Sequence, residues 1–256
     1  MFKDKRFCIR KVFEVIEDLE EARSYYSKVE RIFLADGDAL ILKQEDLLLI
    51  LAKIRELFPE CGRVGVYGSP QDVLRKGVAE LAALKEEGLG IIYIGAESGS
   101  DKVLKDVKKG ATAAEIVEAI KIIESSGINS SVTFISGLAG ANGWREHAEE
   151  TGKMISEAQP SYVGLLTLMV EPMAPIYADI KEGRFKLLSA EDVIRETLLL
   201  LENVNVSKDC IFRSNHASNY LSLKGTLPAD KERMITELSR AMDGQYRLKD
   251  ERLRML

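Results

Sequence analysis

The sequence predicts an α/β fold, an incomplete parallel (β/α) TIM-type barrel of about six strands whose first strand is missing. Short apolar, β-branched runs alternate with amphipathic helical patterns, which is typical of a parallel sheet. Each run is followed by glycine, serine, asparagine or acidic residues, as at the carboxyl face of a βα barrel. The chain begins with a helical pattern, so the strand that would open the barrel is absent.

In the first half of the chain, apolar spacing predicts helices over residues 12–25, 44–58 and 71–87. The second of these helices stops before Pro59, and Gly88 closes the third. Short apolar runs between the helices predict strands over residues 31–34 and 63–67.

The second half continues the same alternation. Strands are expected from about residue 90, over 129–136 and 162–170, and over 210–213. Helices are expected over residues 112–125, 144–158, 189–202 and 229–242, and capping residues mark two of their starts. Residues 246–256 are expected to form an exposed helix or a frayed end. The expected division is a partial barrel over residues 1–228 and a C-terminal helix and tail over 229–256.

Composition limits the classes of protein to which the chain can belong. It has 256 residues, 46% of them apolar, which is ordinary for an α/β barrel with a sizeable core. The net charge of −5 gives no reason to expect a nucleic acid as partner. The sequence has no apolar run of about 18 residues and no apolar signal core at its amino end, so no membrane partner is expected. Three widely separated cysteines suggest a reducing, cytoplasmic location.

The stretch Ile91–Ser100 carries the first candidate site. A buried strand is expected to end here, to present the carboxylate of Glu97, and to turn directly into a helix. Ser98 and Asp101 stand three residues apart, as in a capping box that opens this helix. The alternative is an ordinary strand–turn–helix in which Glu97 is a solvated or capping residue.

The turn Asp36-Gly37-Asp38 is the second candidate. Gly37 would let a ligand approach the backbone closely, and the two carboxylates could bind an ammonium group or a divalent cation. A polar turn with solvated carboxylates is the plainer interpretation. The pattern also resembles the first motif of Mg²⁺-dependent haloacid dehalogenase-like phosphatases, but no later strand ends in the acidic pair that this family needs.

Other polar residues at strand ends are weaker candidates. Tyr67 and Ser69 could place a hydroxyl in the site, although Ser69 is equally suited to cap a helix. His147 stands among glutamates and is expected to be exposed, whereas His216 lies in a loop rich in hydrogen-bonding side chains and could contact a substrate. No two cysteines have metal-clip spacing, so no metal ligands are expected.

Together these residues resemble the radical SAM superfamily, on its coproporphyrinogen-dehydrogenase-like and Elongator-like side. The similarity runs from Met1 to about Asp230. Its strongest part is the segment from Ile94 to Asp101, which reads Ile-Gly-Ala-Glu-Ser-Gly-Ser-Asp, followed by Lys108-Lys109-Gly110.

This resemblance implies S-adenosylmethionine as cofactor and gives residues roles. Glu97 matches the position that binds the ribose, and Lys109 matches a basic position for the methionine carboxylate. Asp36, Gly37 and Asp38 match the segment that binds the methionine amino group. Further cofactor contacts are expected from Tyr67, Ser69, Ser98, Thr133, Ser136 and Gly137, with the Gly137–Gly140 loop beside the adenine. Substrate contacts are expected from Glu171, His216 and Asn219.

The chain departs from the family at its amino end. In the family, three cysteines spaced Cys-x3-Cys-x2-Cys follow the first strand and bind a [4Fe-4S] cluster, at which S-adenosylmethionine is cleaved reductively and hydrogen is then abstracted from a substrate. No such triplet is present. Residues 1–7 look like the segment that follows the third cysteine in relatives, so the missing strand and the missing cysteines are one absence. The cluster is therefore expected only if an upstream cysteine segment exists.

Two explanations stay open. In one, Met1 is internal to a longer protein that is a full radical SAM enzyme of oxidoreductase type. In the other, the product is truncated, and it is a cluster-less barrel that binds S-adenosylmethionine or acts as a scaffold without radical chemistry. Whether the chain itself is an enzyme, and on which substrate, is left open. For this chain alone, the unpaired edge of the strand at 31–34 predicts a homodimer through that edge or a tendency to aggregate.

Overall fold

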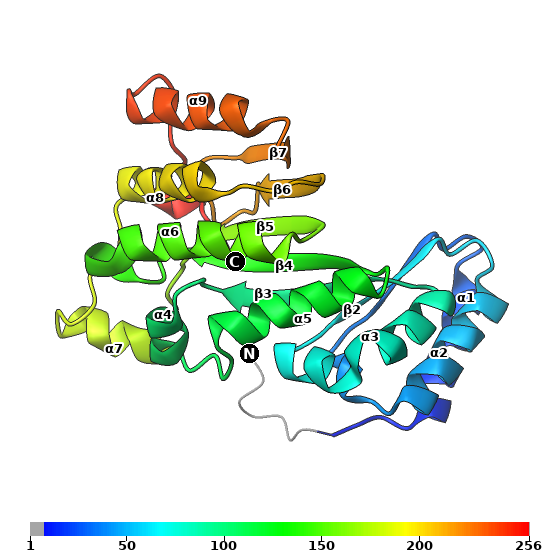
Figure 1. The fold of residues 1–256 in the computed structure, drawn as a ribbon. Helices are drawn as coiled ribbons and strands as arrows, with labels where there is room; N and C mark the ends of the chain where they lie inside the picture. Colours follow the sequence, from blue (N-terminus) through cyan, green and yellow to red (C-terminus); the bar gives the residue numbers. More distant parts are fainter. Residues whose placement is uncertain (1–7, 256) are drawn as a thin grey trace.

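The computed structural model describes residues 8–255 and shows an α/β fold around one open, seven-stranded sheet. The strands are β1 (Arg31–Leu34), β2 (Arg63–Tyr67), β3 (Leu89–Glu97), β4 (Asn129–Ser136), β5 (Tyr162–Thr167), β6 (Cys210–Ser214) and β7 (Leu223–Leu227). Their order in the sheet is their order in the chain, so the colours of Figure 1 change in sequence order across the sheet. Strands β1 to β6 pair in parallel, and β7 pairs antiparallel with β6.

Within residues 8–255 the sheet does not close, because β1 pairs only with β2 and β7 only with β6. The predicted incomplete barrel with six parallel strands is thus confirmed, and the unpaired edge of β1 is where it was expected. Strand β7 was not predicted. Its five residues include Lys224 and Gly225 and run into Pro228, which weakens every local signal for a strand.

The described residues form nine α-helices, most of which pack on one face of the sheet (Figure 1). They are α1 (Val12–Tyr25), α2 (Gln44–Leu57), α3 (Pro70–Glu86), α4 (Asp101–Asp106), α5 (Ala113–Ser125), α6 (Gly140–Ala158), α7 (Pro175–Lys181), α8 (Ala190–Asn203) and α9 (Lys231–Met242), with 3₁₀ turns η1 (Ala39–Ile41) and η2 (Glu251–Leu253). No helix within residues 8–255 is both long enough and apolar enough to cross a bilayer.

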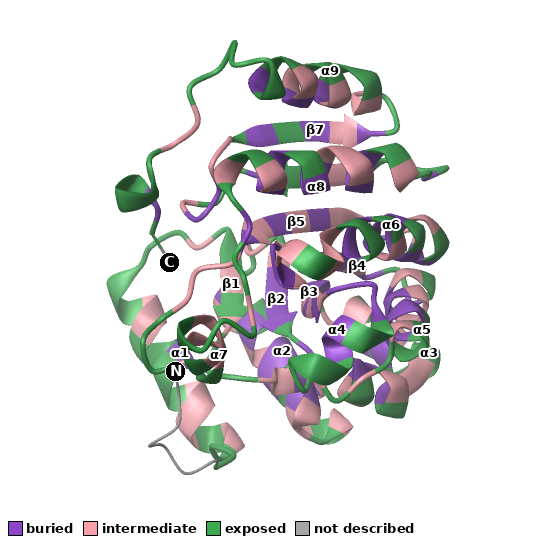
Figure 2. Ribbon diagram, turned by 90° about the vertical axis from the view of Figure 1, so that its left-hand side faces the viewer, coloured by how far each residue is buried: buried purple, intermediate pink, exposed green. Residues whose placement is uncertain are grey.

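The core lies between the helices and alternate residues of the strands. One apolar cluster joins α2, α3 and α5 to β2 and β3 through residues such as Val66 and Ile92, and a second joins α6, α8 and α9 to β4, β5 and β6 through residues such as Phe134 and Phe212. Figure 2 shows these buried positions where the two layers meet, whereas α7 has no buried residue. The opposite face of the sheet carries the intervening, partly exposed side chains.

Two local expectations need correction. The helix expected from residue 144 begins at Gly140, inside the glycine-rich stretch, and Gly140 itself has a left-handed φ of +63°. The capping box expected from Ser98 and Asp101 does not form. Helix α4 starts at Asp101, its N-cap is Ser100, and no side chain makes a capping hydrogen bond. Ser98 Oγ instead accepts the N–H of Ser100 at 2.9 Å.

The C-terminal tail is mostly exposed, as expected, but it is not frayed. The side chain of Arg254 is only 3% exposed. Its Nε donates to Ser218 O at 2.6 Å and its Nη2 to Leu168 O at 2.8 Å. The tail is therefore anchored beside the carboxyl end of β5. The amino-terminal segment expected to follow a cysteine motif, residues 1–7, lies outside the described residues.

Candidate functional site at the carboxyl ends of the strands

Glu97 is the last residue of β3, where the backbone leaves the sheet. Its φ is +67°, a left-handed value that is rare for a residue other than glycine. The register with β4 shifts between Gly95 and Glu97, which is a β-bulge. The side chain of Glu97 folds back over Gly95, since a Cβ on Gly95 would lie 2.4 Å from Glu97 Oε1. Such backbone costs about 1–3 kcal/mol and is concentrated at functional sites.

Lys109 lies beyond the end of α4 and faces Glu97. Its Nζ is 3.0 Å from Glu97 Oε1, and the two side chains are 21% and 23% exposed. Two residues that the sequence assigned to one site, twelve positions apart, are therefore in contact. One carboxylate oxygen of Glu97 and two N–H donors of Lys109 are left for a ligand.

The Asp36-Gly37-Asp38 turn lies after β1, and its two carboxylates differ. Asp38 holds the backbone, because its Oδ2 accepts the N–H of Ser69 at 2.6 Å and its Oδ1 the N–H of Leu40 at 3.0 Å. Burial and the nearby carboxyl of Asp72 raise the pKa of Asp38. Asp36 is exposed, with a φ of +67°, and is the carboxylate of this turn that is open to a ligand.

Ser69 and Tyr67 stand at the end of β2. Ser69 caps α3, as one of the two interpretations expected, with its Oγ accepting the N–H of Asp72 at 3.1 Å. Tyr67 is 52% exposed on the face of the sheet that helices do not cover. Its ring lies edge-to-face against Phe33, with centroids 4.8 Å apart, and 6.0 Å from the ring of Tyr93. Sequence analysis missed Phe33 and Tyr93, although alternation with buried neighbours could have placed both on that face.

The end of β4 is held by a buried carboxylate. Gly137 has a φ of +81°, and its N–H donates to Glu196 Oε2 on α8 at 2.6 Å. Ser136 is 1% exposed, and its Oγ has no hydrogen-bond partner in the described part of the chain. Thr133 is half-buried and lies beside Gly95 in the next strand. Gly137 and Thr133 are thus at the same rim as Glu97.

His147 was expected to be exposed, and this is wrong. It is 2% exposed on the inner face of α6, and its Nδ1 lies 2.9 Å from Glu196 Oε1. A signal for this was present in the sequence, because His147 lies at helical spacing from Thr151, Ile155 and Ala158, all of which are buried. The surrounding glutamates belong to the solvent face.

The backbone beyond several strands is fixed in the same way, by a side-chain oxygen from a neighbouring element. The N–H of Gly99, after β3, donates to Thr151 Oγ1 at 3.0 Å. The N–H of Thr167, at the end of β5, donates to Ser218 Oγ at 3.2 Å. With the bonds to Asp38 and Glu196, this gives four consecutive strand ends whose loops have a buried or half-buried anchor. Such loops are suited to hold ligand-binding groups in fixed positions.

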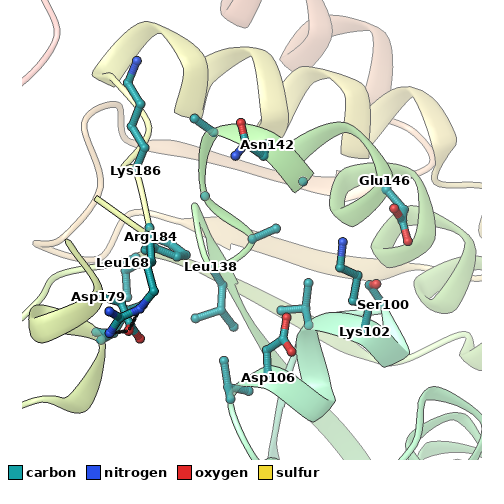
Figure 3. Close-up of a pocket in the computed structure, with 18 of the residues that line it drawn as sticks. Ser100, Lys102, Asp106, Leu138, Asn142, Glu146, Leu168, Asp179, Arg184 and Lys186 are labelled. Atoms are coloured by element: carbon teal, nitrogen blue, oxygen red, sulfur yellow. Dashed lines mark hydrogen bonds and ion pairs between the residues drawn. The ribbon is translucent and has the colours of Figure 1, made fainter. Parts of the chain in front are cut away.

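A cavity of about 530 Å³ lies between the start of α6, α4 and α7. Figure 3 shows Leu138 and Leu168 on one side of it, with Lys102 and Asp106 of α4 opposite. Glu97 and Lys109 do not line this cavity, but the loop from Leu138 to Gly140 does. The volume and the mixed apolar and charged walls are in the range of small-molecule sites.

The three residues expected to contact substrate lie in different surroundings. Glu171 is exposed, between β5 and α7. His216 is exposed, and its Nδ1 accepts the N–H of Ser218 at 3.2 Å. Asn219 is 4% exposed, and its amide is engaged with Thr167 Oγ1 at 2.9 Å and with a backbone carbonyl of β5 at 2.8 Å. A substrate contact stays a prediction for all three.

The cysteines do not fit an iron–sulfur cluster. Cys8 is exposed, Cys61 is partly buried and Cys210 is fully buried in β6. Burial raises the pKa of Cys210 to about 12, so this thiol is not poised to bind a metal. Within residues 8–255, no group of three or more histidine, cysteine or acidic residues could hold a metal ion. The turn Asp36-Gly37-Asp38 after β1 is not part of such a group either. The interpretation as a Mg²⁺-dependent phosphatase therefore has no support.

The chain matches the family model of the radical SAM superfamily over residues 5–154. It is 27% identical over 140 residues to a protein provisionally named as a methylthiotransferase from Methanocaldococcus jannaschii, a match that covers 52% of this chain and 30% of the relative. The chain spans about a third or less of the length of the curated relatives that it matches.

Two solved structures share the fold. Coproporphyrinogen III oxidase from Escherichia coli, titled a radical SAM enzyme, gives a TM-score of 0.57 at 17% identity, over 77% of this chain and 48% of that one. Archaeal Elp3 from Methanocaldococcus infernus gives a TM-score of 0.55 at 15% identity, over 91% of this chain and 59% of that one. At these identities the likeness concerns the fold alone.

Proposed function

The chain belongs to the radical SAM superfamily, and from this premise we propose that it binds S-adenosylmethionine at the carboxyl ends of β1 to β4. The observation that carries the proposal is the contact between Glu97 and Lys109. Their 3.0 Å pair is half-buried, stands on left-handed backbone at the end of β3, and leaves one acceptor and two donors unused. A carboxylate suits two ribose hydroxyls, and an ammonium group suits the methionine carboxylate.

The neighbouring strand ends support the remaining contacts of this proposal. Asp36 and the backbone at Gly37 face the methionine ammonium group, while Asp38 holds the turn in place. The Gly137–Gly140 loop flanks the adenine, whose flat ring would enter the cavity beside Leu138. Further contacts are proposed from the side chains or backbone of the other strand-end residues, Tyr67, Ser69, Ser98, Thr133 and Ser136.

The reaction typical of the family needs a cysteine triplet that this sequence does not contain. In the family, a [4Fe-4S] cluster supplies the electron that cleaves S-adenosylmethionine, and three thiolates at short spacing must bind it. The three cysteines here do not meet that requirement. We therefore propose binding without cleavage for residues 1–256. Reductive cleavage followed by hydrogen abstraction is proposed for any form that also carries a Cys-x3-Cys-x2-Cys segment.

The test is calorimetric titration of the chain with S-adenosylmethionine. We expect binding by the unaltered chain and its loss in Glu97→Ala. The matched control is Glu157→Ala, which removes another glutamate from a 3.0 Å ion pair, with Lys121, outside the site. Equal affinity in Glu97→Ala and the unaltered chain would remove Glu97 from the site. Anaerobic reconstitution of residues 1–256 with iron and sulfide is expected to give no iron–sulfur absorbance band.

The unpaired edge of β1 supports a homodimer as a separate proposal. Its backbone N–H and C=O groups on that side have no strand partner in the described part of the chain, and such edges pair readily. Light scattering after size exclusion is expected to show twice the chain mass of 28.5 kDa. A stable monomer at micromolar concentration would contradict this proposal.

A further inference from the structure

The buried pair Glu196–His147 is not explained by the packing of the core. Both side chains are 1–2% exposed. Burying a carboxylate costs several kcal/mol unless it is well paired, and apolar residues of similar volume often stabilise a fold as well or better. Two buried ionisable groups at this position therefore suggest a role besides stability.

The geometry shows what Glu196 holds. Its Oε2 accepts the N–H of Gly137 at 2.6 Å, and this is the first residue of the Gly137–Gly140 loop. Gly137 has a φ of +81° and Gly140 a φ of +63°, so the loop takes a backbone path that few other residues would adopt. The Gly137 C=O in turn accepts the N–H of Gly140 at 3.1 Å. The carboxylate thus holds the first residue of the loop, and the backbone bond between Gly140 and Gly137 closes the loop on that residue.

His147 fixes the orientation of that carboxylate. Its Nδ1 lies 2.9 Å from Glu196 Oε1, which is the distance of a hydrogen bond between the two side chains. Its Nε2 is buried without a hydrogen-bond partner among the described residues. The two oxygens of Glu196 are therefore engaged by α6 on one side and by the loop after β4 on the other.

We infer that Glu196 and His147 are positioning residues for the adenine half of the S-adenosylmethionine site. The identity of the ligand in this inference rests on the proposed function, whereas the contacts of Glu196 with Gly137 and His147 do not depend on it. The loop that they hold contributes Leu138, Ala139 and Gly140 to the wall of the 530 Å³ cavity. Loss of the bond to Gly137 releases this wall, whereas the Glu97–Lys109 pair on β3 stays in place.

The first measurement is amide hydrogen exchange of Gly137 in the ligand-free protein, as a ratio to the exchange of Val132, which lies in the core of β4. We expect this ratio to rise at least tenfold in Glu196→Ala and in His147→Ala. Glu196→Gln should stay within threefold of the unaltered chain, because its amide oxygen can still accept from Gly137. The control is Thr197→Val, which removes a buried hydroxyl that donates to Val193 O within α8.

The second measurement separates the two halves of the ligand. We expect Glu196→Ala to weaken the binding of 5′-deoxyadenosine and of S-adenosylmethionine at least tenfold each, and Glu196→Gln to restore both. Lys109→Ala should weaken S-adenosylmethionine only. If Glu196→Ala weakens S-adenosylmethionine but not 5′-deoxyadenosine, the inference is overturned.

The two measurements fail separately. If the unaltered chain binds neither ligand, the proposed function fails, and the exchange ratio alone decides whether Glu196 and His147 position the loop. An unchanged Gly137 ratio in both alanine variants overturns the positioning role whatever the chain binds. If Glu196→Ala does not fold, His147→Ala and the rescue by Glu196→Gln decide the same question.

Discussion

Gly95→Ala is the substitution that tests the Glu97 geometry most directly. A methyl group there would lie 2.4 Å from Glu97 Oε1 and 3.3 Å from Lys109 Nζ, where ordinary contacts are 3.4–4 Å. The carboxylate must therefore move by about 1 Å, which breaks or remakes its 3.0 Å bond to Lys109. The displaced atoms are the free end of a flexible side chain, and an ion pair that solvent still reaches contributes about 0–1 kcal/mol. The free energy of unfolding should therefore change by less than about 1 kcal/mol.

The effect on S-adenosylmethionine binding should be larger than the effect on stability. A hydrogen bond to a charged group contributes about 1.5–3 kcal/mol, so losing the aligned carboxylate should weaken binding by roughly 10- to 150-fold. Calorimetric titration measures this loss, and urea unfolding measures stability. The control is Gly62→Ala, where the nearest atom to the added methyl group is 4.0 Å away and both quantities should stay unchanged.

A double-mutant cycle with Glu97→Gln makes the reasoning refutable. If Gly95→Ala acts through the carboxylate, it should cost little further affinity once Glu97 is replaced. Fully additive losses would show that Gly95 acts on binding by another route. Unchanged affinity in Gly95→Ala alone would show that the observed position of the Glu97 carboxylate does not matter for the ligand.

Three further predictions concern the scaffold around the site. Gly99→Ala should destabilise the fold by about 1–3 kcal/mol or more, as measured by urea unfolding. The added methyl group would lie 2.4–2.5 Å from the backbone of α6, which cannot move away as a flexible side chain could. A free energy of unfolding within about 0.5 kcal/mol of that of the unaltered chain would refute this prediction. A thiol reagent should label Cys8 rapidly and leave Cys210 unlabelled until the protein unfolds. The reason is that Cys210 is buried and that burial raises its pKa to about 12. Equal labelling rates of the two cysteines in the folded protein would contradict this prediction. Burial opposes ionisation of Glu124, but hydrogen bonds from Lys208 and neighbouring groups outweigh burial and lower the pKa of Glu124 below its ordinary value of 4.5. The ionised carboxylate should therefore stabilise the fold at pH values above 4.5. This stabilisation should be lost as the pH falls through the lowered pKa of the folded protein. Glu124→Gln should flatten this part of the pH dependence of thermal unfolding, and an unchanged profile would be evidence against it.

Much of the architecture follows from local sequence pattern. Six strands begin within one residue of the expected positions, because apolar β-branched runs buried under helices have a strong periodic signature. Strand β7 was not predicted, because an antiparallel edge strand that contains a lysine and a glycine has almost no periodic signature. The same holds for the C-terminal tail, which is anchored by contacts with distant residues, such as the bonds of Arg254 to Ser218 O and of Lys249 to Ala217 O.

The candidate site divides in the same way. Glu97, Lys109 and the turn after β1 could be named from the sequence, because strand ends in a parallel sheet converge at one edge and the motif around Glu97 resembles a family pattern. That Glu97 and Lys109 touch, and that Asp38 is used by the backbone while Asp36 is open, depends on loop conformation. Loop conformation is set by contacts between distant residues.

The sequence by itself determined that this chain is an open run of βα units with polar residues at the carboxyl ends of its strands. Local periodicity and strand–helix alternation are properties of short segments, and they survive without knowledge of packing. Only the tertiary structure decided which polar residues face a ligand and which hold the loops. His147 and Glu196 are 49 residues apart, and no local pattern could predict that their side chains meet beneath Gly137.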